Sequence, residues 1–185
     1  MSITINGNGT VSGLTAAPNL TSSGLTTGKI LQVKQTVKAD TASTTSLDTF
    51  EDISGMSVAI TPSATNSKIL IMVDMRLSTN TNRNVVYRIM RGSTALHIGD
   101  TAGNRTRATG GIRITDDAKH EAQSETAIFL DSPSTTSATT YKVQWCQTYD
   151  SGGEASYINR SYMDSDANND RQRYSSTITD MEVAA

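Results

Sequence analysis

Apolar and polar residues alternate over several segments of the chain, and this period of two is the pattern of β-strands with two different faces. Residues 30–38 place Leu31, Val33 and Val37 on one face and polar side chains on the other. Residues 67–78 give the strongest strand: one face is apolar throughout, and Leu70 and Met72 begin an apolar second face. Strands that are apolar on both faces are typical of the centre of a packed sheet.

Further strands are predicted at residues 55–62, 85–91, 95–98, 124–133, 139–150, 154–161 and 173–185. Pro62 and Pro133 end two of them, because proline cannot donate to a strand ladder, and Gly92 with Ser93 supplies a hairpin turn. The polar stretches 39–55, 101–123 and 162–173 are interpreted as loops, the first with a weak edge strand as its alternative. About eight or nine short strands with little helix predict an all-β, jelly-roll-like antiparallel β-sandwich.

The first 28 residues differ from the rest of the chain. They carry no charge, are rich in Gly, Ser, Thr and Asn, and contain only scattered apolar residues. Such a segment cannot bury enough apolar surface to offset its ordering entropy. We therefore expect an extended N-terminal arm at residues 1–28 and a β-sandwich domain at residues 29–185, with the arm ordering against another copy or another protein by adding a strand to an exposed edge.

Composition excludes several classes of partner. The formal net charge is −2 and only 18% of the residues are charged, which argues against binding to nucleic acid or to an anionic membrane. Cys146 is the single cysteine, so no disulfide within the chain is expected, and its apolar surroundings favour a packing role over a nucleophilic one. No secretory signal and no long apolar span are found, so a soluble protein made in a cytoplasm is expected.

Three groups of residues are candidates for a chemical site. Asp164, Asp166, Asn168 and Asp170 have the spacing of a calcium loop, but Asn169 replaces the required Gly and Ser175 the closing Glu, so a solvated turn is favoured over a loose cation site.

The second group contains Asp116, Asp117, His120, Glu121 and Glu125; it matches no zinc spacing and is interpreted as a charged loop. The third, residues 99–111 with Arg105 and Arg107, lacks the ending of a phosphate-binding loop. It is interpreted as an exposed or interface loop, with binding of an anionic sugar or of another subunit's carboxylates as the alternative. Trp145 and the late tyrosines suit a carbohydrate surface or simply core and subunit contacts. We expect no catalytic residue, metal or cofactor, and no enzymatic activity.

Several stretches in order resemble a family of small virion proteins of tailed phages of cyanobacteria and other aquatic bacteria. They are ITINGNGTVSGL, GKILQVKQT, ISGMSVAITPSATNSKILIMVDM, YRIMRGSTAL followed by GD, FLDSPSTTSATTYKVQW and SSTITDMEVAA. Each is weak alone, and their order and spacing carry the resemblance over most of the chain.

The resemblance implies a jelly-roll-like sandwich that forms a homotrimer on the virion surface. Two placements follow: a capsid decoration, or cement, protein that contacts the major capsid protein, and a tail-fibre or tail-tip module that binds a host surface glycan. The first placement is favoured, because a receptor binder of this size would have only a short anchor, without the larger attachment domain and shaft that long fibres usually carry. A lectin-like or enzymatic module unrelated to virions is a third class. The chain departs from the family pattern at Asp180, where an apolar residue is expected. If buried, Asp180 needs a partner, such as an Arg or Lys of a neighbouring subunit.

Residues expected to contact another subunit or the shell come from the arm and from the long loop. They are Ile3, Ile5, Val11, Leu14, Arg105, Arg107 and Arg113.

Overall fold

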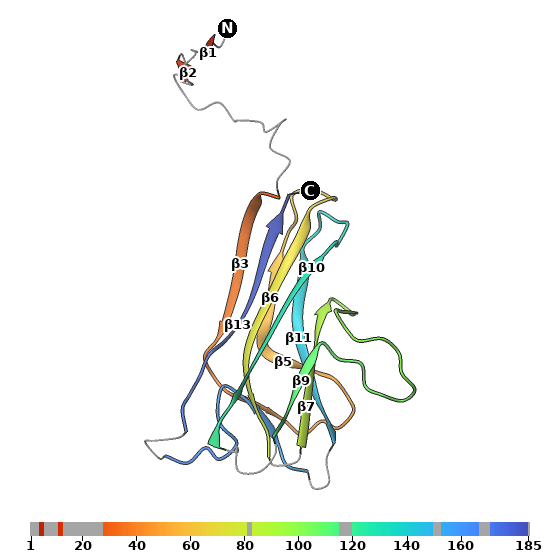
Figure 1. Ribbon diagram of the computed structural model, residues 1–185, viewed down its shortest axis with the longest axis vertical. Helices are drawn as coiled ribbons and strands as arrows, with labels where there is room; N and C mark the ends of the chain where they lie inside the picture. The colour runs from red at the N-terminus through yellow and green to blue at the C-terminus, as the bar shows by residue number, and fades with distance from the viewer. Residues whose placement is uncertain are drawn as a thin grey trace.

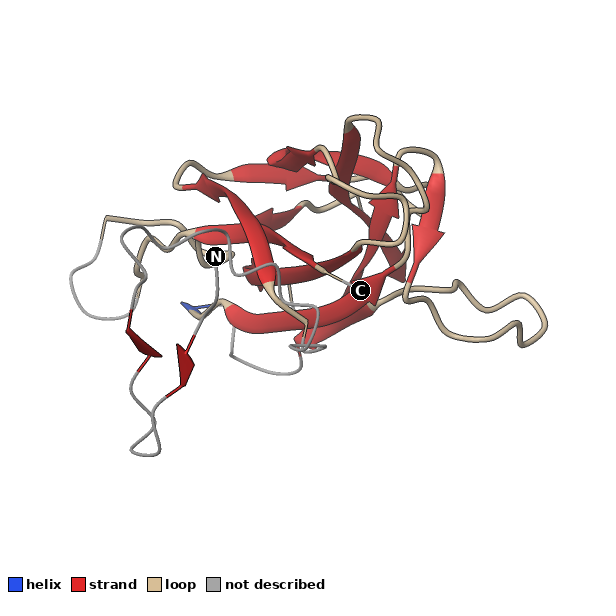
Figure 2. Cartoon of the chain, turned by 90° about the horizontal axis from the view of Figure 1, so that it is seen from above, coloured by secondary structure: helices blue, strands red, loops and turns tan. Residues whose placement is uncertain are grey.

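Two antiparallel β-sheets pack face to face in the body of the chain (Figures 1 and 2). The structure is a computed structural model that describes residues 28–80, 83–114, 120–149, 153–166 and 171–184, together with the backbone of residues 4–5 and 11–12. The predicted all-β fold class is confirmed. Across the residues that the structure describes, no helical segment has the length and apolarity needed to cross a membrane.

The first sheet has four long strands side by side (Figure 1), with two short ones extending it near β6. In spatial order the long strands are β3 (Ile30–Lys38), β13 (Ser176–Val183), β6 (Lys68–Ser78) and β10 (Gln123–Asp131). The short ones are β12 (Ser156–Ile158) and β4 (Ala42–Thr44). All these pairings are antiparallel.

The second sheet is built around β7. In order it contains β5 (Glu51–Ile60), β11 (Thr139–Tyr149) and β7 (Arg83–Arg91), and β7 also pairs with β8 (Thr94–Leu96) and β9 (Gly110–Ile114). Because most successive long strands alternate between the two sheets, the connectivity is that of a jelly roll. A separate short hairpin joins β1 (Thr4–Ile5) and β2 (Val11–Ser12).

One apolar core fills the space between the sheets. Its largest fully buried side chains include Trp145, Tyr87 and Tyr141 from the second sheet. From the first sheet, the alternate residues of β6 face it: Ile69, Ile71, Val73, Met75 and Leu77. The predicted apolar face of residues 67–78 is therefore the core face.

Two sequence predictions about loops are refined by the structure. The predicted loop at residues 101–123 contains β9, whose Gly110 and Gly111 conceal the strand pattern. In the stretch 39–55 the weak edge strand is present as β4, which lies at the edge of its sheet. The strand predicted at 55–62 begins earlier, at Glu51.

The two ends of the sandwich domain lie together. β3 and β13 pair in antiparallel register, and Ala184 donates a backbone hydrogen bond of 2.8 Å to the carbonyl oxygen of Lys29. A Cβ added at Gly28 would approach a methyl carbon of Val183 within 2.8 Å. The chain therefore enters β3 and leaves β13 at the same end of the sandwich (Figure 1).

Candidate functional site

The outward surface of the first sheet is the candidate interaction site. Directly paired residues of antiparallel strands share a face, so the register fixes which side chains lie opposite the core. Seven apolar side chains among them, from all four long strands, are called here the apolar face: Val33, Val37, Met181, Leu70, Met72, Ile128 and Leu130.

An unbroken apolar row crosses the whole sheet within this face. Val33 pairs with Met181, Met181 with Leu70, and Leu70 with Leu130. Cross-strand neighbours of this kind have Cβ atoms about 4.5–5.5 Å apart. The four side chains therefore form a continuous apolar strip from one edge of the sheet to the other.

The two ends of the strip are open to solvent. Val33 is 53% exposed on β3 and Leu130 is 46% exposed on β10. Six of the nine large hydrophobic residues that are exposed within the described chain belong to these two strands: Ile30, Leu31, Val33, Val37, Ile128 and Leu130. Exposed apolar residues that gather in this way mark a binding surface, whereas scattered ones do not.

The polar side chains of this surface are paired with one another. In the row beside the apolar strip, Gln35 donates a 2.8 Å hydrogen bond from its amide to the hydroxyl of Thr179. In the next row, Arg76 contacts Asp74 at 2.6 Å, and Thr126 donates to the same Asp74 oxygen at 3.3 Å. Covering the surface would leave few of these groups unsatisfied, so its burial carries a small polar penalty.

The outward surface of the second sheet has the opposite character. Lys142 contacts Asp52 at 2.7 Å, Gln144 donates to the other Asp52 oxygen at 2.7 Å, and Arg88 donates two hydrogen bonds to Gln144. The guanidinium of Arg88 also lies 4.0 Å from the centre of the Phe50 ring. This charged network, called here the polar face, is already suited to water.

The predicted alternation of β3 is confirmed, and the structure adds which of its two faces meets the core. The face with Leu31, Val33 and Val37 points to solvent, whereas Gln32 and Thr36 reach the carbonyl oxygens of Thr61 and Ser57 beside β5. In the sequence, the apolar outer face is indicated by the second apolar side of residues 67–78, which Leu70 and Met72 begin. Sequence pattern alone attributes that side to a strand in the centre of a packed sheet.

A buried acidic group lies on the inner side of the same sheet. Asp131 accepts hydrogen bonds from Arg91 at 2.7 Å and from the hydroxyl of Tyr141 at 2.6 Å. Asp180 is fully buried nearby, and neither of its oxygens has a hydrogen-bond partner among the described residues. Burial raises the pKa of Asp180 to about 8, and the charge of Asp131 adds to the rise.

The expectation that a neighbouring subunit supplies a partner for Asp180 is therefore wrong in its geometry. Asp180 pairs with Ile71, whose side chain belongs to the core, so its carboxyl group faces the interior of the sandwich and not an outer surface. The raised pKa favours the protonated, neutral form of the carboxyl group, which needs no counter-charge.

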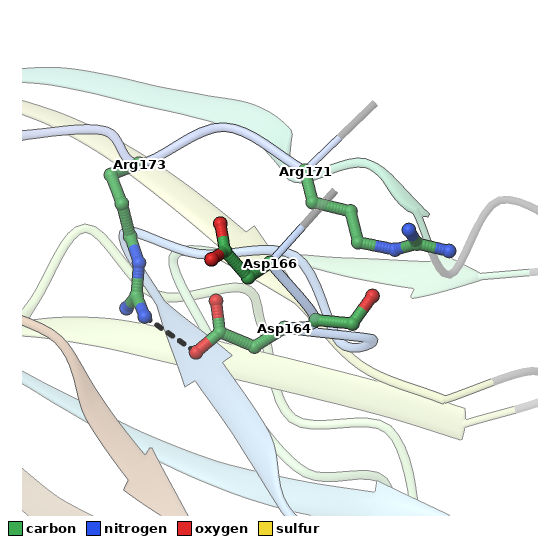
Figure 3. Close-up of a pocket in the computed structure, with 5 residues that line it drawn as sticks. Asp164, Asp166, Arg171 and Arg173 are labelled. Carbon is green, nitrogen blue, oxygen red and sulfur yellow. Dashed lines mark hydrogen bonds and ion pairs between the residues drawn. The ribbon is translucent and has the colours of Figure 1, made fainter. Parts of the chain in front are cut away.

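At the acidic turn, for which a loose cation site was the alternative interpretation, Asp164 forms ion pairs with arginine side chains. Asp164 lies between two guanidinium groups, 2.6 Å from Arg173 and 3.4 Å from Arg160. Figure 3 shows Arg173 turned toward Asp164 in a shallow pocket that Asp166 and Arg171 also line. These ion pairs engage Asp164, the strongest candidate ligand for a cation. Asn168 and Asp170 lie outside the described residues. The described chain contains no cluster of three His, Cys, Asp or Glu side chains suited to a metal ion.

The acidic residues of the second group, interpreted from sequence as one charged loop, do not all lie in a loop. Asp116 and Asp117 lie outside the described residues, and Glu125 is in β10 rather than in a charged loop. Glu125 is packed at the inner side of the sheet: burial raises its pKa, while hydrogen bonds from Tyr87 and from the backbone of Gly111 oppose that rise.

The predicted contact residues lie in different places. Ile3 and Leu14 lie outside the described residues, and Ile5 pairs with Val11 in the backbone of the β1–β2 hairpin, whose side chains are not described.

Arg105 and Arg107 are exposed on the loop between β8 and β9, which projects from the body (Figure 1), and Arg107 donates a 2.6 Å hydrogen bond to the carbonyl oxygen of Gly99. Arg113 is in strand β9 and not in a loop, and its guanidinium lies 5.9 Å from the centre of the Tyr149 ring.

Cys146 is completely buried. Burial, with a smaller contribution from Asp48, raises the pKa of its thiol to about 11. A thiol that remains protonated at neutral pH is a poor nucleophile, in agreement with the predicted packing role.

No protein-family model matches this chain, and no curated protein is significantly similar to it.

Proposed function

We propose that this chain is a non-enzymatic structural protein of a bacteriophage virion. In the form favoured here it is a trimeric capsid decoration protein, located on the outer surface of the capsid and bridging subunits of the major capsid protein. The residue pattern that resembles small phage virion proteins suggests this class.

One structural observation supports the proposal more than any other. The sandwich has one broad apolar outer surface and one charged outer surface. The exposed apolar surface supports a protein that assembles with other subunits, as a trimeric decoration protein does, because such a protein loses solvent-exposed apolar area when it assembles.

The body of the protein is also suited to bearing load. Its long strands are linked in two ladders, and hydrogen bonds between the sheets add rigidity to the packed core, as the contact between Tyr141 and Asp131 illustrates. Packed interiors of this kind are dense and resist compression. A stiff body that bridges coat subunits would oppose the outward pressure of packaged DNA.

The test is the copy number of this protein in purified particles, measured by quantitative densitometry against the major capsid protein. Abundance close to that of the major capsid protein is the expected result, and immunogold labelling should then mark the capsid. Complete absence from purified virions would overturn the proposal. A few copies per particle would instead favour a position on the tail.

A tail-fibre or tail-tip module that binds a host glycan is the second candidate. A specific observation favours it: a shallow groove on the second sheet is lined by Val86, Gly111, Ile112 and Arg113, beside the exposed ring of Tyr149. An aromatic ring and a guanidinium group at the side of a groove are typical of sugar recognition. Binding of the isolated protein to a glycan array, lost in Tyr149→Ala, would support this candidate.

A further inference from the structure

We propose that a second copy of this chain covers the apolar face. The number of copies rests on the proposed homotrimer, whereas the choice of surface rests on the geometry of the sheet alone. The inference therefore names the partner of a surface that the proposed function leaves unassigned. It also sets the orientation of the assembly, since the polar face must then point away from the other copies.

The size of the surface fits a subunit interface. Four strands about 4.8 Å apart and nine residues at about 3.3 Å each give a region of about 20 Å by 30 Å, or roughly 600 Å² in projection. The accessible area exceeds this projection because side chains make the surface rough. A stable interface buries about 800 Å² of accessible surface on each partner, so the sheet is large enough without help from loops.

The charge of the surface favours an identical partner. Asp74 and Arg76 are the charged residues in the central rows, and they neutralise each other at 2.6 Å. Lys68 lies at the margin, opposite Val183. Two such surfaces can approach without repulsion between like charges, and an oppositely charged partner protein has nothing to recognise.

The contrast between the two sheets gives the direction of assembly. In a closed ring of copies, each apolar face lies toward the common axis and contacts its neighbours. The network of Asp52, Arg88, Lys142 and Gln144 then lies on the outside. In the proposed virion this polar face meets the shell or the solvent, and the apolar face is not available for the major capsid protein.

The test compares the solution mass of the purified full chain with that of two double variants, by size-exclusion chromatography with light scattering at micromolar concentration. Val33→Lys with Leu130→Lys places charge at both ends of the apolar strip. Leu47→Lys with Met163→Lys is the matched control, because these residues are 46% and 40% exposed but lie elsewhere. We expect the wild type and the control to have the mass of two or three chains, and the first variant that of one.

Hydrogen exchange of the wild type provides a readout that does not depend on the folding of a variant. Dilution of the protein should increase amide exchange in β3 and β10 and leave exchange in β5 unchanged. Circular dichroism of the variants shows whether each has kept its strands.

Three results would overturn the inference. The first is a wild-type chain with the mass of one copy, and the second is a Val33/Leu130 variant that remains associated. The third is an association abolished only by deletion of residues 1–27, because the arm would then be the occupant. If the protein associates through this face but is absent from virions, the inference stands and the proposed function is refuted. If the protein is a monomer but is abundant in virions, the inference is refuted and a structural role in the virion stands.

Discussion

Tyr141 and Asp131 connect the two sheets through a single short contact: the tyrosine hydroxyl donates a 2.6 Å hydrogen bond to Oδ2 of the aspartate. Tyr141 belongs to β11 and Asp131 to the end of β10, so the bond crosses the core. The same carboxylate accepts a hydrogen bond of 2.7 Å from the guanidinium group of Arg91. Burial first, and then this bond to Asp131, raises the pKa of the Tyr141 hydroxyl far above its usual value.

Replacing Tyr141 with phenylalanine removes this bond and keeps the ring. We expect Tyr141→Phe to lower the free energy of unfolding by about 1–2 kcal/mol, because Asp131 loses one acceptor contact but retains Arg91. Urea unfolding followed by circular dichroism measures the effect. Tyr149→Phe is the control, since Tyr149 is 57% exposed; equal stability of the two variants would contradict the role of the bond.

Asp180 makes the stability of the protein depend on pH. Its pKa is about 8 in the folded chain, against a usual value of 3.8, so the folded state holds a proton that the unfolded state releases. The contribution of Asp180 to stability is therefore complete below about pH 4, declines by about 1.4 kcal/mol per pH unit as the pH rises, and levels off above about pH 8.

The variant Asp180→Asn cannot lose this proton. We expect its thermal midpoint to fall less than that of the wild type between pH 5 and pH 8, and to exceed the wild-type value at pH 8. All other titrating groups are common to both proteins, so the difference between the two curves isolates Asp180. Parallel curves would show that the carboxyl group is ionised in the folded state.

Gly111 allows β9 to approach β7 closely. A Cβ at this position would lie 2.6 Å from the carbonyl oxygen of Val85 and 2.9 Å from Cα of Val86. Because both atoms are backbone, Gly111→Ala should displace the strand and cost about 1–3 kcal/mol of unfolding free energy. At Gly99 an added Cβ meets no atom within 4 Å, so Gly99→Ala should have little effect in the same urea titration.

Asn159 joins three parts of the first sheet at one buried position. Its amide donates to the carbonyl oxygens of Lys38 and Asp40 at 2.7 and 2.9 Å, and its carbonyl accepts from Ser176 at 2.6 Å. Its φ angle of 65° lies in the left-handed region, which asparagine tolerates better than most residues.

Asn159→Ala loses these hydrogen bonds and adds backbone strain. We expect a loss of about 2–4 kcal/mol in unfolding free energy, measured by urea titration. Asn104→Ala in the exposed β8–β9 loop should leave stability unchanged. If both variants match the wild type, Asn159 does not hold the three segments together.

Period-two patterning was enough to predict the fold and most of the long strands. Residues 30–38 and 139–149 alternate cleanly and form β3 and β11. Patterning separates two faces of a strand, but it does not show which face meets the core when both can be covered. At β3 the polar side turns inward because Gln32 and Thr36 find carbonyl acceptors near β5.

The candidate site was less accessible to sequence reasoning. The apolar strip depends on the register that brings Val33, Met181, Leu70 and Leu130 together, and these residues are far apart in the chain. Asp180 was recognised as unusual from sequence, but its location inside the sandwich required the pairing with Ile71. β9 was missed because two glycines interrupt its alternation.

The close pairing of β3 and β13, the first and last strands of the sandwich, has a mechanical consequence. Lys29 and Ala184 are hydrogen-bonded neighbours at one end of the β3–β13 ladder. A force that separates residue 28 from residue 184 acts across that ladder and not along it, so it loads the inter-strand bonds one pair after another. The sandwich would open like a zipper at low tension if pulled by its two ends, whereas a load transmitted through the outer surfaces of its sheets is shared by all the strands at once.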